Sequence, residues 1–119
     1  MNSTVLNVTF DCRDPRRVAE FWSAVTGYAI EDVDSPGNRY WVVSGPDGRL
    51  PRLVFVGVPE PKVVKNRVHL DVLPVERDQE AEVGRLLSLG AKVVDDRRQL
   101  EPGGWVVLAD PEGNEFCVE

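Results

Sequence analysis

The chain has 119 residues and a formal net charge of −6, with 42% hydrophobic and 29% charged residues. This length predicts one compact domain, and the excess of negative charge argues against a nucleic-acid partner. No apolar run approaches the roughly 18 residues of a membrane span, and the first eight residues lack the pattern of a signal peptide. We therefore predict a cytoplasmic protein with no membrane partner.

The first half of the chain reads as a strand, a helix and three further strands. Asp14 is a typical N-cap, Pro15 suits the first helical position, and Gly27 is a typical residue just past a helix end. The predicted strands cover residues 4–12, 28–33, 39–44 and 52–58, with turns at 35–38 and 46–48. The elements of this half therefore follow the order βαβββ.

A linker of residues 59–61 separates a module of residues 1–58 from a module of residues 62–119, and the same order then starts again. The second module is predicted to hold a helix over residues 76–89, and turns at 102–104 and 111–114. Its strands are predicted at residues 67–73, 91–95, 105–109 and 114–119. Two βαβββ units differ from both a doubly wound parallel sheet and an all-β sandwich, so the pattern predicts an α+β fold.

The two modules also share landmarks in the same order. The segment 41–48, which begins Trp-Val-Val, recurs as segment 105–113, and Gly27 recurs as Gly90. These landmarks are offset by 60 to 65 positions. Because a module of about 60 residues buries only about 60% of its unfolded surface, we expect both to belong to one domain, residues 1–119.

Side chains alternate across a strand, which gives each predicted sheet an apolar face for its helix and a polar face. The polar face carries Asn7, Thr9 and Asp11 in the first strand, Arg67, His69 and Asp71 after the linker, and Glu115, Cys117 and Glu119 in the last strand. Such a face is either solvated or the lining of a ligand cup. Three tryptophans in so small a chain favour the cup.

Several side chains admit both a functional and a structural interpretation. His69, the sole histidine, is either a hydrogen-bonding or proton-transfer group in a pocket or a polar residue bonded to Asp71. Trp41 and Trp105 either flank a flat ligand or fill the core. Cys117 would need a base and a lowered pKa to act as a nucleophile, whereas a small buried residue needs neither.

The remaining polar and sulfur-bearing residues favour structural roles. Without an export signal, Cys12 and Cys117 are predicted to be buried free thiols rather than a disulfide. Asp110 and Asn114 are typical turn-stabilising residues. The Arg97–Arg98 pair is either an anion-binding site or solvated surface.

The doubled module resembles the vicinal oxygen chelate superfamily, which includes glyoxalase I, extradiol dioxygenases and bleomycin-resistance proteins. Within it the chain looks most like the small glyoxalase-like domains. The matching segments are the helix of residues 14–28 with its Phe-Trp pair, and residues 56–62, 65–72 and 105–117. The resemblance implies curled mixed sheets around a central cavity, a glyoxalase/bleomycin-resistance-like fold, and a homodimer.

Metal-dependent members of this superfamily resemble one another in four ligands, and spacing carries these to Asn7, Val56, His69 and Cys117. Only His69 is a usual ligand of a divalent catalytic metal, since Val56 has no donor and Cys117 brings a thiolate where carboxylate is usual. We therefore predict no metal site of the usual kind and no other cofactor. A zinc site at His69 and Cys117, completed by water or Asp71, stays open.

The prediction for function is a glyoxalase-like protein that binds a small-molecule ligand. Its predicted ligand-binding residues are Asn7, Trp41, Val56, His69, Trp105 and Cys117. The alternative is a lyase or isomerase of the vicinal oxygen chelate type that uses His69 and Asp71 for proton transfer, with or without a metal. Common folds host many activities, so the resemblance alone does not choose between these.

Overall fold

The chain divides into two compact units, Met1–Pro61 and Lys62–Glu119, whose boundary lies at the end of the predicted linker. The computed structural model describes residues 2–32, 37, 39–99 and 103–119. Of the predicted turn at 35–38 only residue 37 is described, and the predicted turn at 102–104 is described from residue 103 on. That both modules form one domain stays a prediction.

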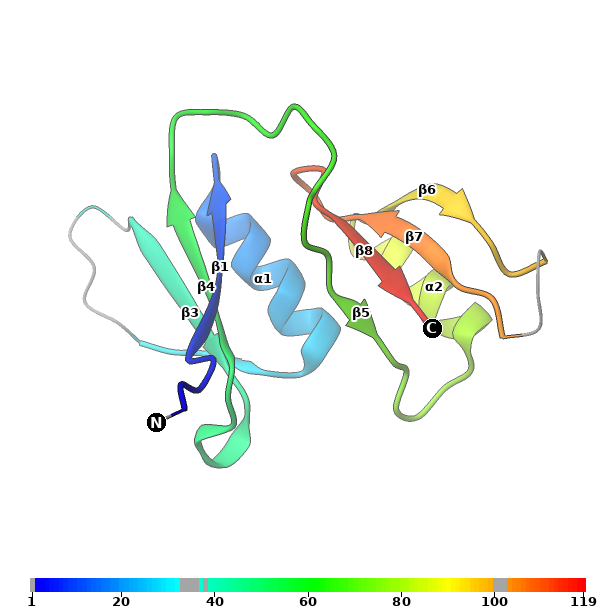
Figure 1. Ribbon diagram of the computed structural model, residues 1–119, viewed down its shortest axis with the longest axis horizontal. Helices are drawn as coiled ribbons and strands as arrows, with labels where there is room; N and C mark the ends of the chain where they lie inside the picture. Colours follow the sequence, from blue (N-terminus) through cyan, green and yellow to red (C-terminus); the bar gives the residue numbers. More distant parts are fainter. Residues whose placement is uncertain (1, 33–36, 38, 100–102) are drawn as a thin grey trace. The chain divides into compact units, whose positions relative to one another are not determined.

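The first unit is a four-stranded mixed sheet with one helix (Figure 1). Its elements are β1 (Asn7–Cys12), α1 (Pro15–Thr26), β2 (Ala29–Ile30), β3 (Tyr40–Ser44), the 3₁₀ turn η2 (Pro46–Gly48) and β4 (Arg52–Gly57). The strand order is β1-β4-β3-β2, with β1 and β4 parallel and the other pairs antiparallel.

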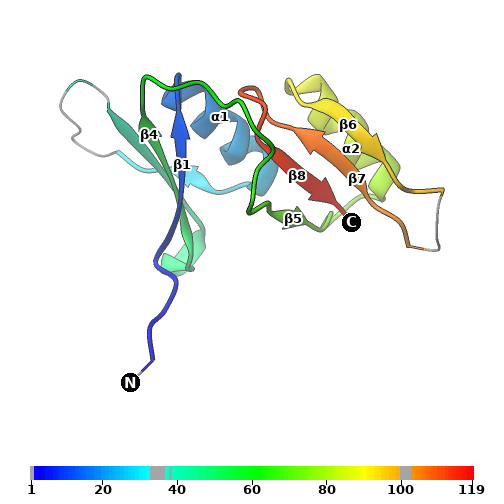
Figure 2. The same ribbon diagram turned by 45° about the horizontal axis from the view of Figure 1, so that its top comes forward.

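The second unit repeats this arrangement. Its elements are β5 (Asp71–Val72), α2 (Gln79–Ser88), β6 (Lys92–Asp96), β7 (Val106–Ala109) and β8 (Glu115–Val118). The order β5-β8-β7-β6 again has its first pair parallel and the rest antiparallel. Figure 2 shows α2 against one face of this sheet, and no described helix of the second unit covers the other face. Two βαβββ modules with open mixed sheets confirm the predicted fold class.

Local sequence signals explain where the helices begin and end. The side chain of Asp14 accepts a hydrogen bond from Arg17 N, and Gly27 ends α1 in the left-handed conformation at φ 73°. In α2 the side chain of Asp78 accepts from Ala81 N at 2.8 Å. Because Asp78 is the N-cap, α2 begins at Gln79 rather than at residue 76 as predicted.

The predicted strand at residues 67–73 is much shorter in the structure. Only Asp71 and Val72 pair with β8, and Cys117 N also donates to Leu70 O at 2.9 Å. β5 is the end strand in the order of its sheet, so β8 alone supports its ladder. The residues before Leu70 carry strand propensity but have no place in that ladder.

Each unit buries an apolar core between its helix and its sheet. In the first unit Phe10 lies between Trp22 and Phe55, with ring centroids 5.4 and 5.0 Å away. Trp22 and Phe55 are both buried. The core of the second unit includes the fully buried Leu86, Val106, Leu108, Phe116 and Val118.

Candidate functional site

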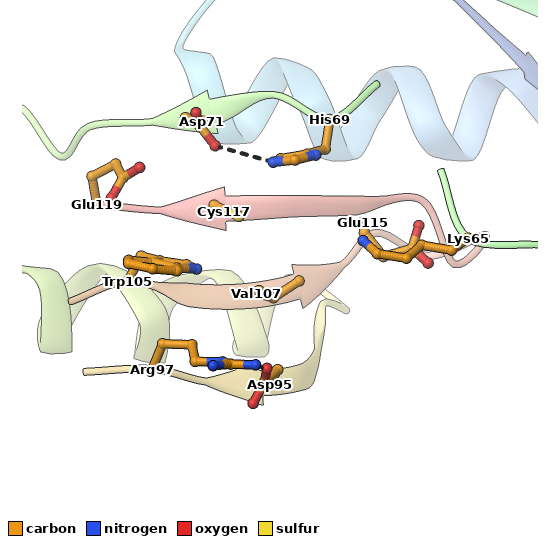
Figure 3. A pocket seen from close by; sticks show the side chains of 10 residues that line it. All are labelled: Lys65, His69, Asp71, Asp95, Arg97, Trp105, Val107, Glu115, Cys117 and Glu119. Atoms are coloured by element: carbon orange, nitrogen blue, oxygen red, sulfur yellow. Dashed lines mark hydrogen bonds and ion pairs between the residues drawn. The ribbon is translucent and has the colours of Figure 1, made fainter. Parts of the chain in front are cut away.

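A cavity of about 550 Å³ lies on the helix-free face of the second sheet (Figure 3). Its volume is within the range of small-molecule sites, roughly 300–1,000 Å³. Residues of all four strands and of the adjoining segments line it: Lys65, His69, Asp71, Asp95, Arg97, Trp105, Val107, Glu115, Cys117 and Glu119.

The alternation of side chains in β8 accounts for much of this lining. Phe116 and Val118 are fully buried on the helix side, whereas Glu115, Cys117 and Glu119 face the cavity. The face that the sequence predicts to be polar is therefore the face that carries the cavity.

His69, Asp71 and Cys117 come together in the cavity. Asp71 is paired directly with Cys117 between β5 and β8, and His69 precedes Asp71 by two residues on the same face. One potential ligand atom from each of the three side chains lies within 4.8 Å of the others, and His69 Nε2 is 3.7 Å from Asp71 Oδ1. The histidine and aspartate side chains are 44% and 56% exposed, so both are reachable from the cavity.

The thiol of Cys117 is protonated at neutral pH. Burial, reinforced by the negative charge of Asp71 and a hydrogen bond to it, raises the pKa of the Cys117 thiol to about 11. Since the thiolate is the reactive form, Cys117 is a poor nucleophile in this environment. Both Cys12 and Cys117 are buried thiols that form no disulfide, as predicted.

Trp105 and β6 form another side of the cavity. The backbone N–H of Arg97 donates to Trp105 O at 2.8 Å, and Arg97 Nε lies 2.7 Å from Asp95 Oδ2. A side chain at Gly104 would collide with the backbone of Arg97, so glycine is required for this close approach. Arg97 therefore lines the cavity as half of an ion pair, and Arg98 pairs with Asp96 outside it.

The Glu115 side chain links the segment at the start of the second unit to β8 through hydrogen bonds. Its carboxylate accepts from Lys62 Nζ at 2.6 Å and from Asn66 N at 3.0 Å. Burial acts to raise the pKa of Glu115, but these donors together hold it below its ordinary value. The segment that contains Lys65 is thereby held at the cavity.

The turn between β7 and β8 is closed by Asp110 and Asn114, as the sequence predicts. Asp110 Oδ1 accepts from the backbone N–H groups of Glu112 and Asn114, and Asp110 Oδ2 accepts from Asn114 Nδ2 at 2.9 Å. Both side chains are buried, so this turn fixes the entry of β8 into the site.

Of the predicted ligand-binding residues, the structure brings His69, Trp105 and Cys117 to this cavity. Asn7, Trp41 and Val56 belong to the first unit, and their role in binding stays a prediction. Asn7 Oδ1 accepts from Arg52 Nε at 2.9 Å.

The apparent equivalence of Trp41 and Trp105 is one residue out of register. Trp41 pairs with buried Phe55 and lies within 5.8 Å of the Arg16 guanidinium, so it faces α1. In β7 the fully buried Val106 faces the core, which turns Trp105 to the cavity. Ala29 and Lys92 each lie two residues after the repeated glycine, and they pair with Ser44 and Ala109. Ser44 is therefore the counterpart of Ala109, and Tyr40, four residues earlier, is the counterpart of Trp105.

The same register corrects one of the four family ligand positions. Cys117 pairs with Asp71, which follows His69 by two residues. Asn7 is the first-module counterpart of His69, and Thr9, two residues after Asn7, pairs with Val54. Val54 rather than Val56 is therefore the counterpart of Cys117. Neither valine has a donor atom, so the residues present do not fit the four-ligand metal site of the metal-dependent relatives.

Several lining residues were not predicted as ligand contacts. Glu115 and Glu119 share a face with Cys117, and Val107 follows Trp105 by two positions, so strand alternation was the signal that identifies them. Lys65 lies in an irregular segment where no periodicity points to a face.

The doubled module and its open sheets are the fold shared by solved structures of a glyoxalase/bleomycin resistance protein/dioxygenase family enzyme and of a fosfomycin resistance protein. The family model for the glyoxalase-like domain matches residues 7–119, and the chain belongs to that family. No curated protein matches the sequence.

Solved structures share the fold at low identity. A glyoxalase/bleomycin resistance protein/dioxygenase family enzyme from Burkholderia phytofirmans PsJN is 18% identical with a TM-score of 0.73, over 98% of this chain and 97% of that one. The fosfomycin resistance protein FosX from Mesorhizobium loti is 16% identical with a TM-score of 0.74, over 100% and 92%. FosX from Listeria monocytogenes, an E126Q mutant in complex with Mn(II) and 1S,2S-dihydroxypropylphosphonic acid, is 13% identical with a TM-score of 0.72, over 100% and 90%. At these identities the likeness shows the fold alone.

Proposed function

We propose that this protein binds a small organic molecule in the cavity over the second sheet and lacks the usual four-ligand metal site of its metal-dependent relatives. The observation that carries the proposal is the cavity of about 550 Å³, which has an indole at one side and polar groups of β5 and β8 at the other. Ligand sites typically combine such a flat apolar surface with a few polar groups that fix orientation.

Each part of the lining has a distinct task in binding. Trp105 offers a ring face on which a flat ligand stacks. His69 and Asp71 are exposed enough to exchange hydrogen bonds with the polar end of that ligand. Lys65 and Arg97 add positive charge to a cavity that also contains four carboxylates, so ligands with both polar and aromatic parts are favoured.

A thermal-shift screen of aromatic and cationic small molecules tests the proposal, because a ligand that binds only the folded state raises Tm. For any hit, we expect Trp105→Leu to weaken binding roughly tenfold through the loss of stacking. Trp41→Leu is the matched comparison, because Trp41 faces α1 rather than the helix-free face of its sheet, and it tests the predicted role of Trp41 in the same assay. Equal affinities of wild type and Trp105→Leu in calorimetry would contradict the proposal.

A second candidate function is a lyase or isomerase, and the proximity of His69 to Asp71 favours it. At 3.7 Å from Nε2, the carboxylate can orient the imidazole for proton transfer. Neutral His69 would remove a proton from the carbon next to a carbonyl group and return it to the same or a neighbouring carbon, which leaves the imidazole unchanged after each cycle.

Hydrogen exchange tests this second function. Carbonyl compounds that bind are incubated with the protein in D₂O, and proton NMR follows the loss of their α-hydrogen signal. Catalysed exchange that is lost in His69→Gln would support proton transfer. Exchange at the uncatalysed rate for every bound compound would leave binding as the function.

We also propose that the protein assembles as a homodimer. Its support comes from exposed apolar side chains in the segments before and after β5, which are Val63, Val64, Val68, Leu73 and Val75. Clusters of exposed apolar side chains are typical of interfaces.

None of the described helices is long and apolar enough to cross a membrane.

A further inference from the structure

We propose that the second unit alone holds a thiophilic divalent metal ion, of which zinc is the type, through His69, Asp71 and Cys117. The site shares His69 and Cys117 with the four ligand positions of the family, but it takes its third ligand from Asp71 and none from the first module. It also does not depend on the binding of an organic ligand.

The donor set points to zinc. Imidazole nitrogen, carboxylate oxygen and cysteine sulfur are the three ligand types found in zinc sites, and thiolate discriminates against magnesium and calcium. Three protein ligands leave a fourth tetrahedral position for water or another ligand. All three side chains line the cavity, and the cavity provides space for this fourth ligand.

The geometry needs only a small adjustment. Zinc bonds of about 2.0–2.3 Å in a tetrahedron put ligand atoms roughly 3.3–3.6 Å apart. In the structure one atom of each residue lies within 4.8 Å of the others, and the histidine–aspartate pair is already at 3.7 Å. Cys117 is anchored in β8, whereas the more exposed side chains of His69 and Asp71 can rotate to close the remaining distance.

Asp71 would supply a metal ligand in place of those that the first module supplies in relatives with the four-ligand site. In the first sheet, the counterparts of Asp71 and Cys117 are Thr9 and Val54. These residues offer no carboxylate, thiolate or imidazole. When the metal binds, the S–H bond of Cys117 breaks, a sulfur–metal bond forms, and the proton leaves to the buffer.

Cobalt titration tests the site on the full-length protein, first treated with a chelator. One equivalent of Co²⁺ should produce a thiolate-to-cobalt charge-transfer band and intense visible bands of tetrahedral cobalt, and Zn²⁺ should displace both. We expect Cys117→Ser to abolish the charge-transfer band, and Asp71→Asn and His69→Gln to weaken Zn²⁺ binding by more than about 100-fold, beyond the loss typical of outer-shell changes.

Matched variants make the assignment specific. Cys12→Ser removes the other buried thiol and Asp96→Asn removes a carboxylate outside the cavity, so both should bind like wild type. Asn7→Ala separates the two kinds of site, because it weakens binding only if the first module contributes. Circular dichroism of each metal-free variant verifies folding.

Absence of the charge-transfer band would overturn the proposal. So would a Cys117→Ser or Asp71→Asn variant, folded by circular dichroism, that binds Zn²⁺ as tightly as wild type. Weakening by Asn7→Ala equal to that by Asp71→Asn would also overturn it. Because the readout uses metal alone, failure here leaves the organic-ligand proposal intact, and failure of the ligand screen leaves this one intact.

Discussion

At the scale of single residues, the environment decides what a given side chain can do. In the metal-free protein Cys117 is a poor nucleophile, because burial and the Asp71 carboxylate keep its thiol protonated. Glu82 shows the opposite effect, since a buried carboxylate is held in its charged form by two arginines. Its Oε1 lies 2.7 Å from Arg85 Nε and 3.1 Å from Arg77 Nη1.

Glu82→Gln is predicted to lower the free energy of unfolding by about 1–2 kcal/mol at pH 7, because charge-assisted hydrogen bonds are lost. Hydrogen bonds from Arg85, together with both arginine charges, outweigh burial and lower the pKa of Glu82 below its ordinary value of 4.5. A lowered pKa in the folded state stabilises the protein above pH 4.5, and this contribution disappears as the pH falls through the folded pKa. The difference between variant and wild type should therefore shrink in acid.

Urea denaturation between pH 3 and pH 8 measures this. Glu76→Gln is the control, because Glu76 is exposed and precedes α2. A pH-independent difference between wild type and Glu82→Gln would contradict the assignment of the stabilisation to the ionised carboxylate.

At the scale of elements, α2 is tied to the strands that carry the site. Gln79 Nε2 donates to Gly104 O at 2.8 Å and to Val118 O at 3.1 Å. The first turn of α2 therefore contacts the backbone next to Trp105 and at the end of β8. Fraying of this turn should loosen the cavity as well as the helix.

Asp78→Ala is predicted to destabilise the protein by about 1 kcal/mol, the usual cost of losing an N-cap side chain. Amide hydrogen exchange should rise first at Ala81, whose N–H is the capped donor. Asp78→Asn is the matched variant, since asparagine caps about as well as aspartate. Equal destabilisation by both would show that the cap hydrogen bond is not the cause.

At the scale of the whole molecule, one βαβββ module occurs twice, and the second carries the cavity lined by titratable groups. The first sheet carries Thr9 and Val54 where the second carries Asp71 and Cys117. The two modules therefore share an architecture but carry different side chains at equivalent positions of their sheets.

Homodimerisation belongs to this scale as well. Light scattering coupled to size exclusion should give about twice the monomer mass of 13.3 kDa at micromolar concentration. We expect Val68→Asp to shift the mass toward the monomer, because a charge would be buried in the interface. A mass of 13.3 kDa for the wild type would contradict the proposal.

Local patterns were sufficient to predict the element order, the helix caps at Asp14 and Gly27, and the polar face with His69, Asp71 and Cys117. These features depend on residue spacing and on the near neighbours of each residue, and both are present in the sequence itself. The length of β5 was not predictable, because strand propensity does not tell how many residues find a partner.

The sequence by itself therefore determined the fold class, the repeat and which faces of the strands are polar. The tertiary structure decided the register between strands, and a shift of one residue turns a side chain to the opposite face. That shift points Trp41 at α1 and Trp105 at the cavity, although their segments look alike. Strand pairing across a distance in sequence, rather than residue identity, thus decided which tryptophan borders the site.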